Sequence, residues 1–208
     1  MTIRIYSVAK TGDVKLSNNF KVKEFQCHDG TDKVLIDDNL VYMLQRIRDH
    51  FGRALTITSG YRTSTYNNRI GGSPTSYHVK GQACDIRIRG IDPVRVGMYA
   101  ESISAGGIGV YAYSDGFVHV DTRNAKYRWL QVSKSGGYEA ISKIMPTIRK
   151  SGAYNTYNAV RLIQSKLGIS QSGTFGDLTE TAVKNFQLKR GLTKDGIVGT
   201  NTWTEMFS

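Results

Sequence analysis

The sequence predicts an α+β fold with a small antiparallel sheet for residues 1–149, followed by a small all-α segment at 156–208. The helical spacing of apolar residues at 37–51 and the strand-like alternation at 55–58 support the first part. The all-α part follows from a turn–helix pattern that occurs twice in a segment too short for a large core. We expect two domains, joined by a polar linker at 150–155.

The elements of the first half follow from local patterns. Asp37 or Asp38 suits the N-cap of a helix that runs to Phe51, and Gly52 ends it. The buried stripe of this helix is expected to be Leu40, Leu44, Ile47 and Phe51.

The chain then alternates strands and one further helix. Strands are expected at 55–58 and 83–88, and a helix begins at Asp92-Pro93, where aspartate caps and proline takes the first helical position. A hairpin is predicted from 108–113 and 117–122. A short helix at Tyr138–Met145 is expected to end at Pro146.

The second half contains an internal repeat. The segments 173–179 and 196–202 both read Gly-x-apolar-Gly-x-x-Thr, 23 residues apart, and each leads into a helix. The glycines allow a tight turn, and Asp177 and Thr200 are suitable N-caps. We therefore expect a duplicated turn–helix unit.

Three residues form a candidate metal site. His78 and Asp85 lie seven residues apart, and His119 follows in the segment Phe-Val-His-Val-Asp-Thr-Arg. Two imidazoles and one carboxylate leave a fourth position open, as in a catalytic rather than a structural zinc site. Spacing alone does not separate this reading from three ordinary polar residues.

The segment Ser76–Asp85, read as Ser-x-His-x-x-Gly-x-Ala-x-Asp, resembles the signature of the D-alanyl-D-alanine carboxypeptidase-like zinc peptidases. These share a fold with lysostaphin-type endopeptidases and the hedgehog signalling domain. The resemblance covers about residues 18 to 130 and implies one zinc ion held by His78, Asp85 and His119. Further matches are Ser59–Thr63, Tyr66-Asn67, Gly71-Gly72 and Gly107–Tyr111.

Residues 156–208 resemble the three-helix peptidoglycan-binding domain of many wall hydrolases. Most of the matching residues are core and turn positions, so they indicate the fold directly and the ligand only by association. They are Gln164, Phe175, Thr179, Ala182-Val183, Phe186-Gln187, Asp195-Gly196, Val198-Gly199 and Thr202-Trp203.

The resemblance also implies roles around the metal. Arg62 corresponds to the family's substrate arginine, although it could instead tie its loop to the sheet, and Ser76 and Gln82 are expected to face substrate or support the ligands. The general base is Asp121 or, as a weaker choice, Asp115, because the positions that carry this role in several relatives are occupied here by Phe117 and Gly116. Asp121 could equally well only orient a histidine.

Together these features predict a zinc peptidase that cleaves the stem peptide or cross-bridge of peptidoglycan, as a carboxypeptidase or an endopeptidase. The N-terminus lacks the ~7–15-residue apolar segment of a secretory signal, so we expect synthesis in a host cytoplasm and action at the wall. This combination resembles a bacteriophage endolysin for a Gram-positive host. A bacterial autolysin and a non-catalytic, zinc-containing wall-binding protein are the alternatives.

The net charge of +11, from 28 basic and 17 acidic residues, favours a polyanionic partner. We expect peptidoglycan rather than nucleic acid, because no nucleic-acid motif accompanies the charge. No apolar run approaches the ~20 residues of a membrane helix, so membrane insertion is not expected, and we expect a monomer. Cys27 and Cys84 are read as buried thiols, with a disulfide between them left open.

Overall fold

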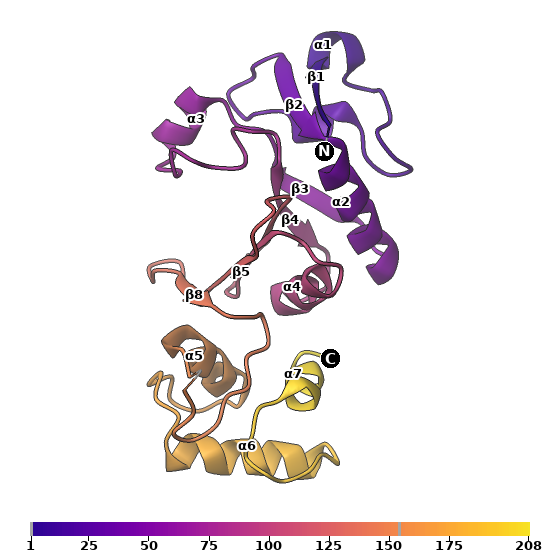
Figure 1. The fold of residues 1–208 in the computed structure, drawn as a ribbon. Helices are drawn as coiled ribbons and strands as arrows, with labels where there is room; N and C mark the ends of the chain where they lie inside the picture. Colours follow the sequence, from indigo (N-terminus) through magenta and orange to yellow (C-terminus); the bar gives the residue numbers. More distant parts are fainter. Residues whose placement is uncertain (1, 154) are drawn as a thin grey trace. The chain divides into compact units, whose positions relative to one another are not determined.

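A computed structural model describes residues 2–153 and 155–208 (Figure 1). The predicted first domain begins at Met1 and the predicted linker contains Tyr154, and these two residues lie outside the described ones. The chain divides into two compact units. The first contains the chain up to Ile91 together with Tyr99–Ile108 and Phe117–Lys126, and the second contains Asp92–Met98, Gly109–Gly116 and Tyr127–Ser208.

The first unit contains most of the predicted α+β elements. It has a two-stranded antiparallel sheet, β1–β2, and the strands β3, β4 and β6 in that order. Two elements, α4 (Pro93–Ser102) and β5 (Gly107–Tyr111), have residues in both units. The elements of the first unit are β1 (Ile3–Ser7), α1 (Val8–Thr11), the 3₁₀ helix η1 (Val22–Phe25), β2 (Lys33–Asp37), α2 (Asp38–Phe51), β3 (Leu55–Ser59), α3 (Ser64–Arg69), β4 (Ala83–Ile88) and β6 (Val118–Asp121).

Helix α2 has the limits and the buried face that its sequence predicts. The Asp37 side chain accepts a hydrogen bond from the backbone N–H of Asn39 at 3.1 Å and so caps the helix. Gly52 ends it with φ of 58°, in the left-handed region that glycine adopts without strain. Leu40, Leu44 and Ile47 are buried, which confirms most of the expected stripe, while Phe51 is half-buried.

Strand pairing fixes which residues lie side by side in the first unit. β4 pairs with β3 and β6, antiparallel to both, which confirms the strands expected at 55–58 and 83–88. The register places Asp85 opposite His119, and Ala83 opposite Asp121. Because alternate residues of a strand share a face, this register carries Asp85, His119 and Asp121 to one side of the sheet.

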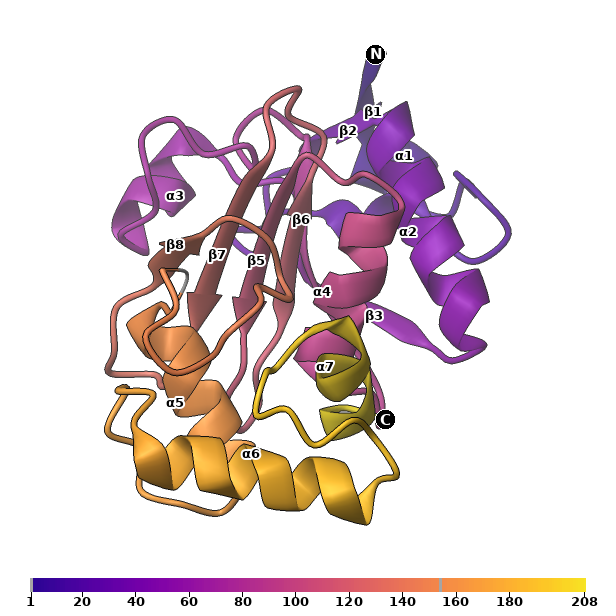
Figure 2. The ribbon, with the colours of Figure 1, turned by 60° about the horizontal axis from the view of Figure 1, so that its bottom comes forward.

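Besides its parts of α4 and β5, the second unit contains the strands β7 and β8, and the strand order there is β5-β7-β8. It also contains the helices α5, α6 and α7, which Figure 2 shows in orange to yellow. The helix expected at Tyr138–Met145 is wrong, because residues 139–141 form a strand paired antiparallel with β7. A helix of eight residues gains little from its own hydrogen bonds, so pairing with a neighbouring strand outweighs it. The elements are β7 (Tyr127–Gln131), β8 (Glu139–Ile141), α5 (Tyr157–Lys166), α6 (Asp177–Lys189) and α7 (Thr200–Met206).

Hydrogen bonds within the second unit join the helices to residues that precede the expected linker. The Glu139 carboxylate accepts from the backbone N–H groups of Tyr157 (3.1 Å) and Asn158 (2.7 Å), and so caps the start of α5. The buried indole N–H of Trp203 donates to the carbonyl of Pro146 at 2.8 Å. The helices are therefore bonded into the unit that contains β7 and β8.

The internal repeat is built around a buried glutamine in each half. Gln164 donates from Nε2 to Thr174 O (3.1 Å), Thr179 Oγ1 (3.0 Å) and Ser172 Oγ (3.0 Å). Its Oε1 accepts from the backbone N–H of Gly173 at 2.9 Å. The glutamine thus ties the turn to the helix that follows it.

Gln187, 23 residues later, repeats this network at equivalent positions. Its Nε2 donates to Ile197 O (3.0 Å), Thr202 Oγ1 (3.2 Å) and Asp195 Oδ1 (2.8 Å), and its Oε1 accepts from Gly196 N at 2.9 Å. The duplicated turn–helix unit expected from the sequence is confirmed, and these glutamines explain how each turn is held.

The helix caps of the repeat differ from expectation by one residue. Asp177 and Thr200 are the first helical residues, while Gly176 and Gly199 occupy the N-cap positions without a side-chain cap. The N-cap needs extended backbone, and the glycines supply it here.

Cys27 and Cys84 are buried and free, so the disulfide that the sequence left open between them is not formed. Within the described parts of the chain, no helix has the length and apolar character needed to cross a membrane.

Replacing Gln164 or Gln187 with leucine should destabilise the protein by about 1–3 kcal/mol each, because the turn N–H loses its buried partner. Denaturant unfolding of the full chain measures this. Gln171→Leu, at an exposed position, serves as the control. Losses equal to that of the control would contradict the proposed importance of the buried glutamines.

Ending the chain at residue 149 should lower the thermal unfolding midpoint of the remaining part. Truncation removes the helix that Glu139 caps and the indole that bonds to Pro146, and it exposes the fully buried Ile148. Calorimetry of the full and shortened chains tests this, and an unchanged midpoint for residues 1–149 would show that the contacts contribute nothing to stability.

Candidate metal centre

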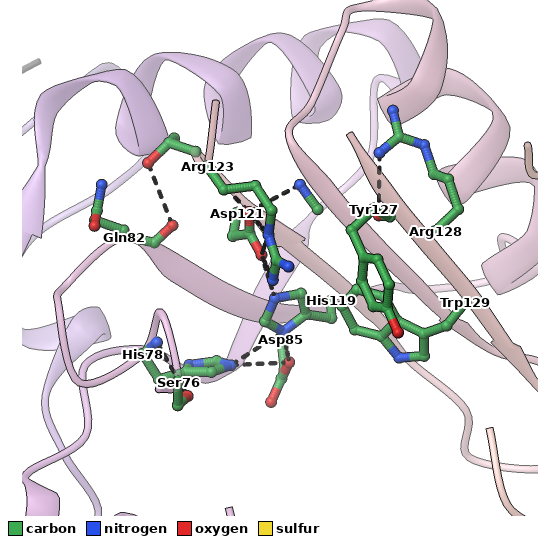
Figure 3. Close-up of polar contacts among 12 residues, drawn as sticks. Ser76, His78, Gln82, Asp85, His119, Asp121, Arg123, Tyr127, Arg128 and Trp129 are labelled. Atoms are coloured by element: carbon green, nitrogen blue, oxygen red, sulfur yellow. Dashed lines mark hydrogen bonds and ion pairs between the residues drawn. The ribbon is translucent and has the colours of Figure 1, made fainter. Parts of the chain in front are cut away.

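His78, Asp85 and His119 are buried and lie together in the first unit (Figure 3). One ligand atom from each residue lies within 4.8 Å of the others. His119 Nδ1 is 3.0 Å from Asp85 Oδ1 and 3.2 Å from His78 Nε2, and His78 Nε2 is 3.3 Å from Asp85 Oδ1. The three residues that the sequence singled out therefore converge.

His78 is placed by a tight turn before β4. Its backbone N–H donates to Ser76 Oγ at 3.3 Å, and Gly81 has φ of 70°, where an added Cβ would collide with the carbonyl oxygen of Leu35. The ring nitrogen Nδ1 lies 2.7 Å from the carbonyl of Gly60. Since a carbonyl only accepts, Nδ1 carries the proton and Nε2 presents its lone pair to the cluster.

His119 is oriented from its other side. Its Nε2 lies 3.1 Å from Asp121 Oδ2, so Nε2–H donates to this carboxylate and Nδ1 faces Asp85 and His78. A carboxylate or carbonyl behind the imidazole is the usual way in which proteins fix the tautomer of a metal-binding histidine. Both histidines show this arrangement.

Asp121 is fully buried, and both of its oxygens accept hydrogen bonds. Oδ1 accepts from the backbone N–H groups of Gly107 (2.8 Å) and Arg123 (3.0 Å). Arg123 Nε lies 2.9 Å from each oxygen, and its Nη2 lies 2.5 Å from Oδ2. An added Cβ on Gly107 would collide with Oδ2, so the carboxylate fills the space that this glycine leaves. Asp121 thus lies behind His119, away from the converging ligand atoms.

Electrostatics keep both carboxylates ionised. Burial alone would raise the pKa of Asp85, but its close contacts with His78 and His119 hold it below its usual value. Burial likewise opposes ionisation of Asp121, yet the hydrogen bonds from His119 and Arg123 lower its pKa. Burial alone would lower the pKa of His119. Its contacts with the carboxylates of Asp121 and Asp85 outweigh burial, so the net shift of this pKa is upward.

Arg62, expected to bind substrate, contacts a ligand. Its Nη2 lies 2.5 Å from Asp85 Oδ2, the oxygen turned away from the histidines, and its Nε donates to Ser59 Oγ at 2.8 Å. Ser76 is half-buried and holds the turn before His78. Both residues are therefore bonded to a candidate ligand residue, Arg62 to Asp85 and Ser76 to His78.

The remaining expected site residues are Gln82 and Asp115. Gln82 is buried, and its backbone carbonyl accepts from Thr122 N at 3.1 Å. Asp115 belongs to the second unit, where its side chain is 74% exposed and lies 3.9 Å from Lys134 Nζ.

The sequence analysis did not identify two groups that contact the candidate site. These are Arg123, which bonds to Asp121, and the carbonyl of Gly60, which accepts from His78. Arg123 follows Asp121 by two residues in Asp-Thr-Arg, and the charge alternation there was an available signal. The role of Gly60 is carried by its backbone and therefore leaves no signal in the side-chain pattern.

The donor set fits a divalent metal. Imidazole nitrogen and carboxylate oxygen are the ligands that zinc takes in sites with an open position. Asp85 supplies the negative charge, and each histidine has its second nitrogen engaged by an acceptor. The cluster therefore qualifies as a possible metal site on its chemistry.

The family described as Peptidase M15 matches residues 18–121, half of the 208 residues, and this stretch contains the whole His78–Asp85–His119 cluster. This chain belongs to the peptidase M15 family. A second family, described as "Putative peptidoglycan binding domain", matches residues 156–206. Both resemblances read from the sequence are thus confirmed.

Curated relatives of this M15 chain include the peptidoglycan L,D-endopeptidase MepK of Escherichia coli K12, which is 38% identical over 99 residues, 44% of this chain and 54% of MepK. The "Probable peptidoglycan L,D-endopeptidase MepK" of Haemophilus influenzae is 36% identical over 95 residues, 42% of this chain and 50% of that protein. The chain therefore spans about half the length of the curated relatives it matches.

Among solved structures, a peptidoglycan-binding protein from Clostridioides difficile, in complex with glutamine hydroxamate, is similar over 64% of this chain and 54% of that chain. The identity is 20% and the TM-score 0.29, which establishes no shared fold.

Replacing His78, Asp85 or His119 with alanine should sharply lower the content of divalent metal in the purified protein, because each removes one of three candidate ligand atoms. Metal analysis after dialysis measures the content. His50→Ala, which alters a histidine stacked on Tyr99, should keep the metal content of the wild type. Undiminished metal in all three variants would refute the assignment.

Proposed function

We propose that this protein is a zinc-dependent peptidoglycan hydrolase that cleaves a peptide bond of the stem peptide or cross-bridge. The observation that carries the proposal is the buried convergence of His78 Nε2, Asp85 Oδ1 and His119 Nδ1 in a chain of the peptidase M15 family. The putative peptidoglycan-binding segment and the MepK relatives, named for acting on peptidoglycan, support the substrate class.

His78, Asp85 and His119 would hold a single zinc ion. When bound, zinc supplies a Lewis acid for the peptide carbonyl and lowers the pKa of coordinated water towards ~7. The protein's own contribution is to fix the ligands. Gly60 O holds the His78 Nδ1–H, and Asp121 holds the His119 Nε2–H.

We assign Asp121 the orienting role and not that of general base. Its oxygens already accept from His119, Arg123 and Gly107, and the residue is fully buried. Arg62 supports Asp85 by bonding to its Oδ2, the oxygen turned away from the histidines, and the side chain of Arg62 is only 14% exposed. The exposed Asp115 is retained as the alternative proton acceptor.

The finer biological setting is also proposed. An endopeptidase specificity is favoured over a carboxypeptidase, because the MepK relatives are named L,D-endopeptidases. The pairing of an M15 peptidase with a peptidoglycan-binding segment suits an endolysin for a Gram-positive host, with a bacterial autolysin as the alternative. We propose a monomer with a peptidase domain at 1–149, a linker at 150–155 and a wall-binding domain at 156–208, acting on the wall without nucleic acid or membrane insertion.

Zymography on purified walls tests this function. Clearing that a chelator abolishes and zinc restores would support the hydrolase, and mass spectrometry of the released muropeptides would identify the bond. Sedimentation with walls without clearing, at full zinc content, would instead indicate a non-catalytic binding protein.

Asp121→Asn should lower zinc affinity by about 10–100-fold, because a neutral amide orients the His119 Nε2–H less strongly than a carboxylate. Competition with a chromogenic chelator measures the affinity. Unchanged zinc affinity combined with a turnover loss of about 10²–10⁴ would favour the general-base role instead.

A further inference from the structure

Arg123 makes the most extensive contact with Asp121. Its Nε lies 2.9 Å from both carboxylate oxygens and its Nη2 lies 2.5 Å from Oδ2, the oxygen that also accepts from His119 Nε2. The Arg123 side chain is 20% exposed and that of Asp121 is fully buried. The pair is therefore a charge-assisted contact largely shielded from water.

A second contact restrains the guanidinium of Arg123. Its central carbon lies 4.4 Å from the ring centroid of Tyr77, a cation–π distance, and Lys80 Nζ lies 4.3 Å from the same centroid. Tyr77 directly precedes His78 in the chain. Arg123 is thus held between the turn that carries one proposed ligand and the carboxylate that orients another.

We propose that Arg123 is a positioning residue for the metal centre, which rests on the proposed zinc function. Through Asp121 it keeps the Nε2–H of His119 engaged and so leaves Nδ1 as the atom that faces Asp85 and His78. The carboxylate of Asp121 has two backbone donors on Oδ1, whereas Oδ2 accepts only from the side chains of His119 and Arg123 among the described residues. Removing Arg123 therefore weakens the fixation of the oxygen that holds the imidazole.

Lysine is a poor substitute at this position. The planar fork of arginine donates to both carboxylate oxygens at once and stacks on an aromatic ring, while an ammonium acts as a point charge. An Arg123→Lys variant should keep the charge beside Asp121 but lose part of the geometric constraint.

The experiment compares zinc affinity, by chelator competition, for full-length wild type, Arg123→Met, Arg123→Lys and Lys80→Met. We expect a loss of about 10–100-fold for Arg123→Met, the range for residues that orient metal ligands, and a smaller loss for Arg123→Lys. Lys80→Met is the matched control, because Lys80 contacts the same Tyr77 ring but is not among the hydrogen-bond donors to Asp121. Its zinc affinity should be unchanged.

A second readout is the nitrogen chemical shifts of the His119 imidazole in the zinc-loaded protein. Wild type and Lys80→Met should show one tautomer with Nε2 protonated, and Arg123→Met should show a mixture or a shifted Nε2 signal. This signature separates orientation from a general loss of stability. If Arg123→Met does not fold, Arg123→Lys carries the same two measurements.

Wild-type zinc affinity and an unaltered His119 spectrum in a folded Arg123 variant would overturn the proposal. An equal loss in Lys80→Met would also overturn it, by attributing the effect to packing on Tyr77. Neither readout depends on hydrolysis, so the two proposals can fail separately. A protein that binds zinc through His119 but does not clear walls would refute the proposed hydrolase function and leave the role of Arg123 standing.

Discussion

The candidate metal centre depends on the antiparallel register of β4 and β6. This register sets Asp85 opposite His119 and brings Asp121 onto the same face, while His78 arrives from the turn before β4. Because side chains alternate along a strand, a shift of one residue would turn Asp85 to the opposite face and remove a ligand. The buried apolar residues of both strands, such as Ile86 and Val120, fix this register and so keep the candidate ligand atoms together.

The charges around the cluster balance before any ion is present. Asp85 is paired with Arg62, and Asp121 with Arg123, so two carboxylates and two guanidiniums cancel formally. A divalent ion would then add its whole charge to a neutral set, which is the situation in which a bound cation dominates the local potential. Arg62 contacts Oδ2 of Asp85, which leaves Oδ1 directed towards the histidines.

Local patterns predicted the parts of the structure that depend on few residues. Helix α2, strand β4 and the internal repeat could be read from local spacing, because periodicity determines them. The three candidate ligand residues needed, in addition, the resemblance of the Ser76–Asp85 segment to a family signature. The strand at Glu139–Ile141 could not, since a short segment takes its conformation from the strand it pairs with. The position of Asp121 behind His119 was left open for a similar reason: two residues on one strand face share a side, but only tertiary donors such as Gly107 N decide where a carboxylate points.

The cap that Glu139 places on α5 has a consequence for exchanging the segment 156–206, which matches the putative peptidoglycan-binding family, between proteins. A graft made at residues 150–155 would separate the carboxylate from the helix whose first N–H groups it satisfies, and the Trp203 indole from the Pro146 carbonyl. The backbone N–H groups of Tyr157 and Asn158 and the indole N–H of Trp203 would then lack their acceptors in the chimaeric protein. A chimaera that keeps Glu139 and Pro146 with the helices retains both contacts but separates β8 from its partner strand β7. Because Asn158 of α5 also donates to the Leu130 carbonyl of β7, an exchange that keeps these contacts would have to transfer β7 and β8 together with the helices.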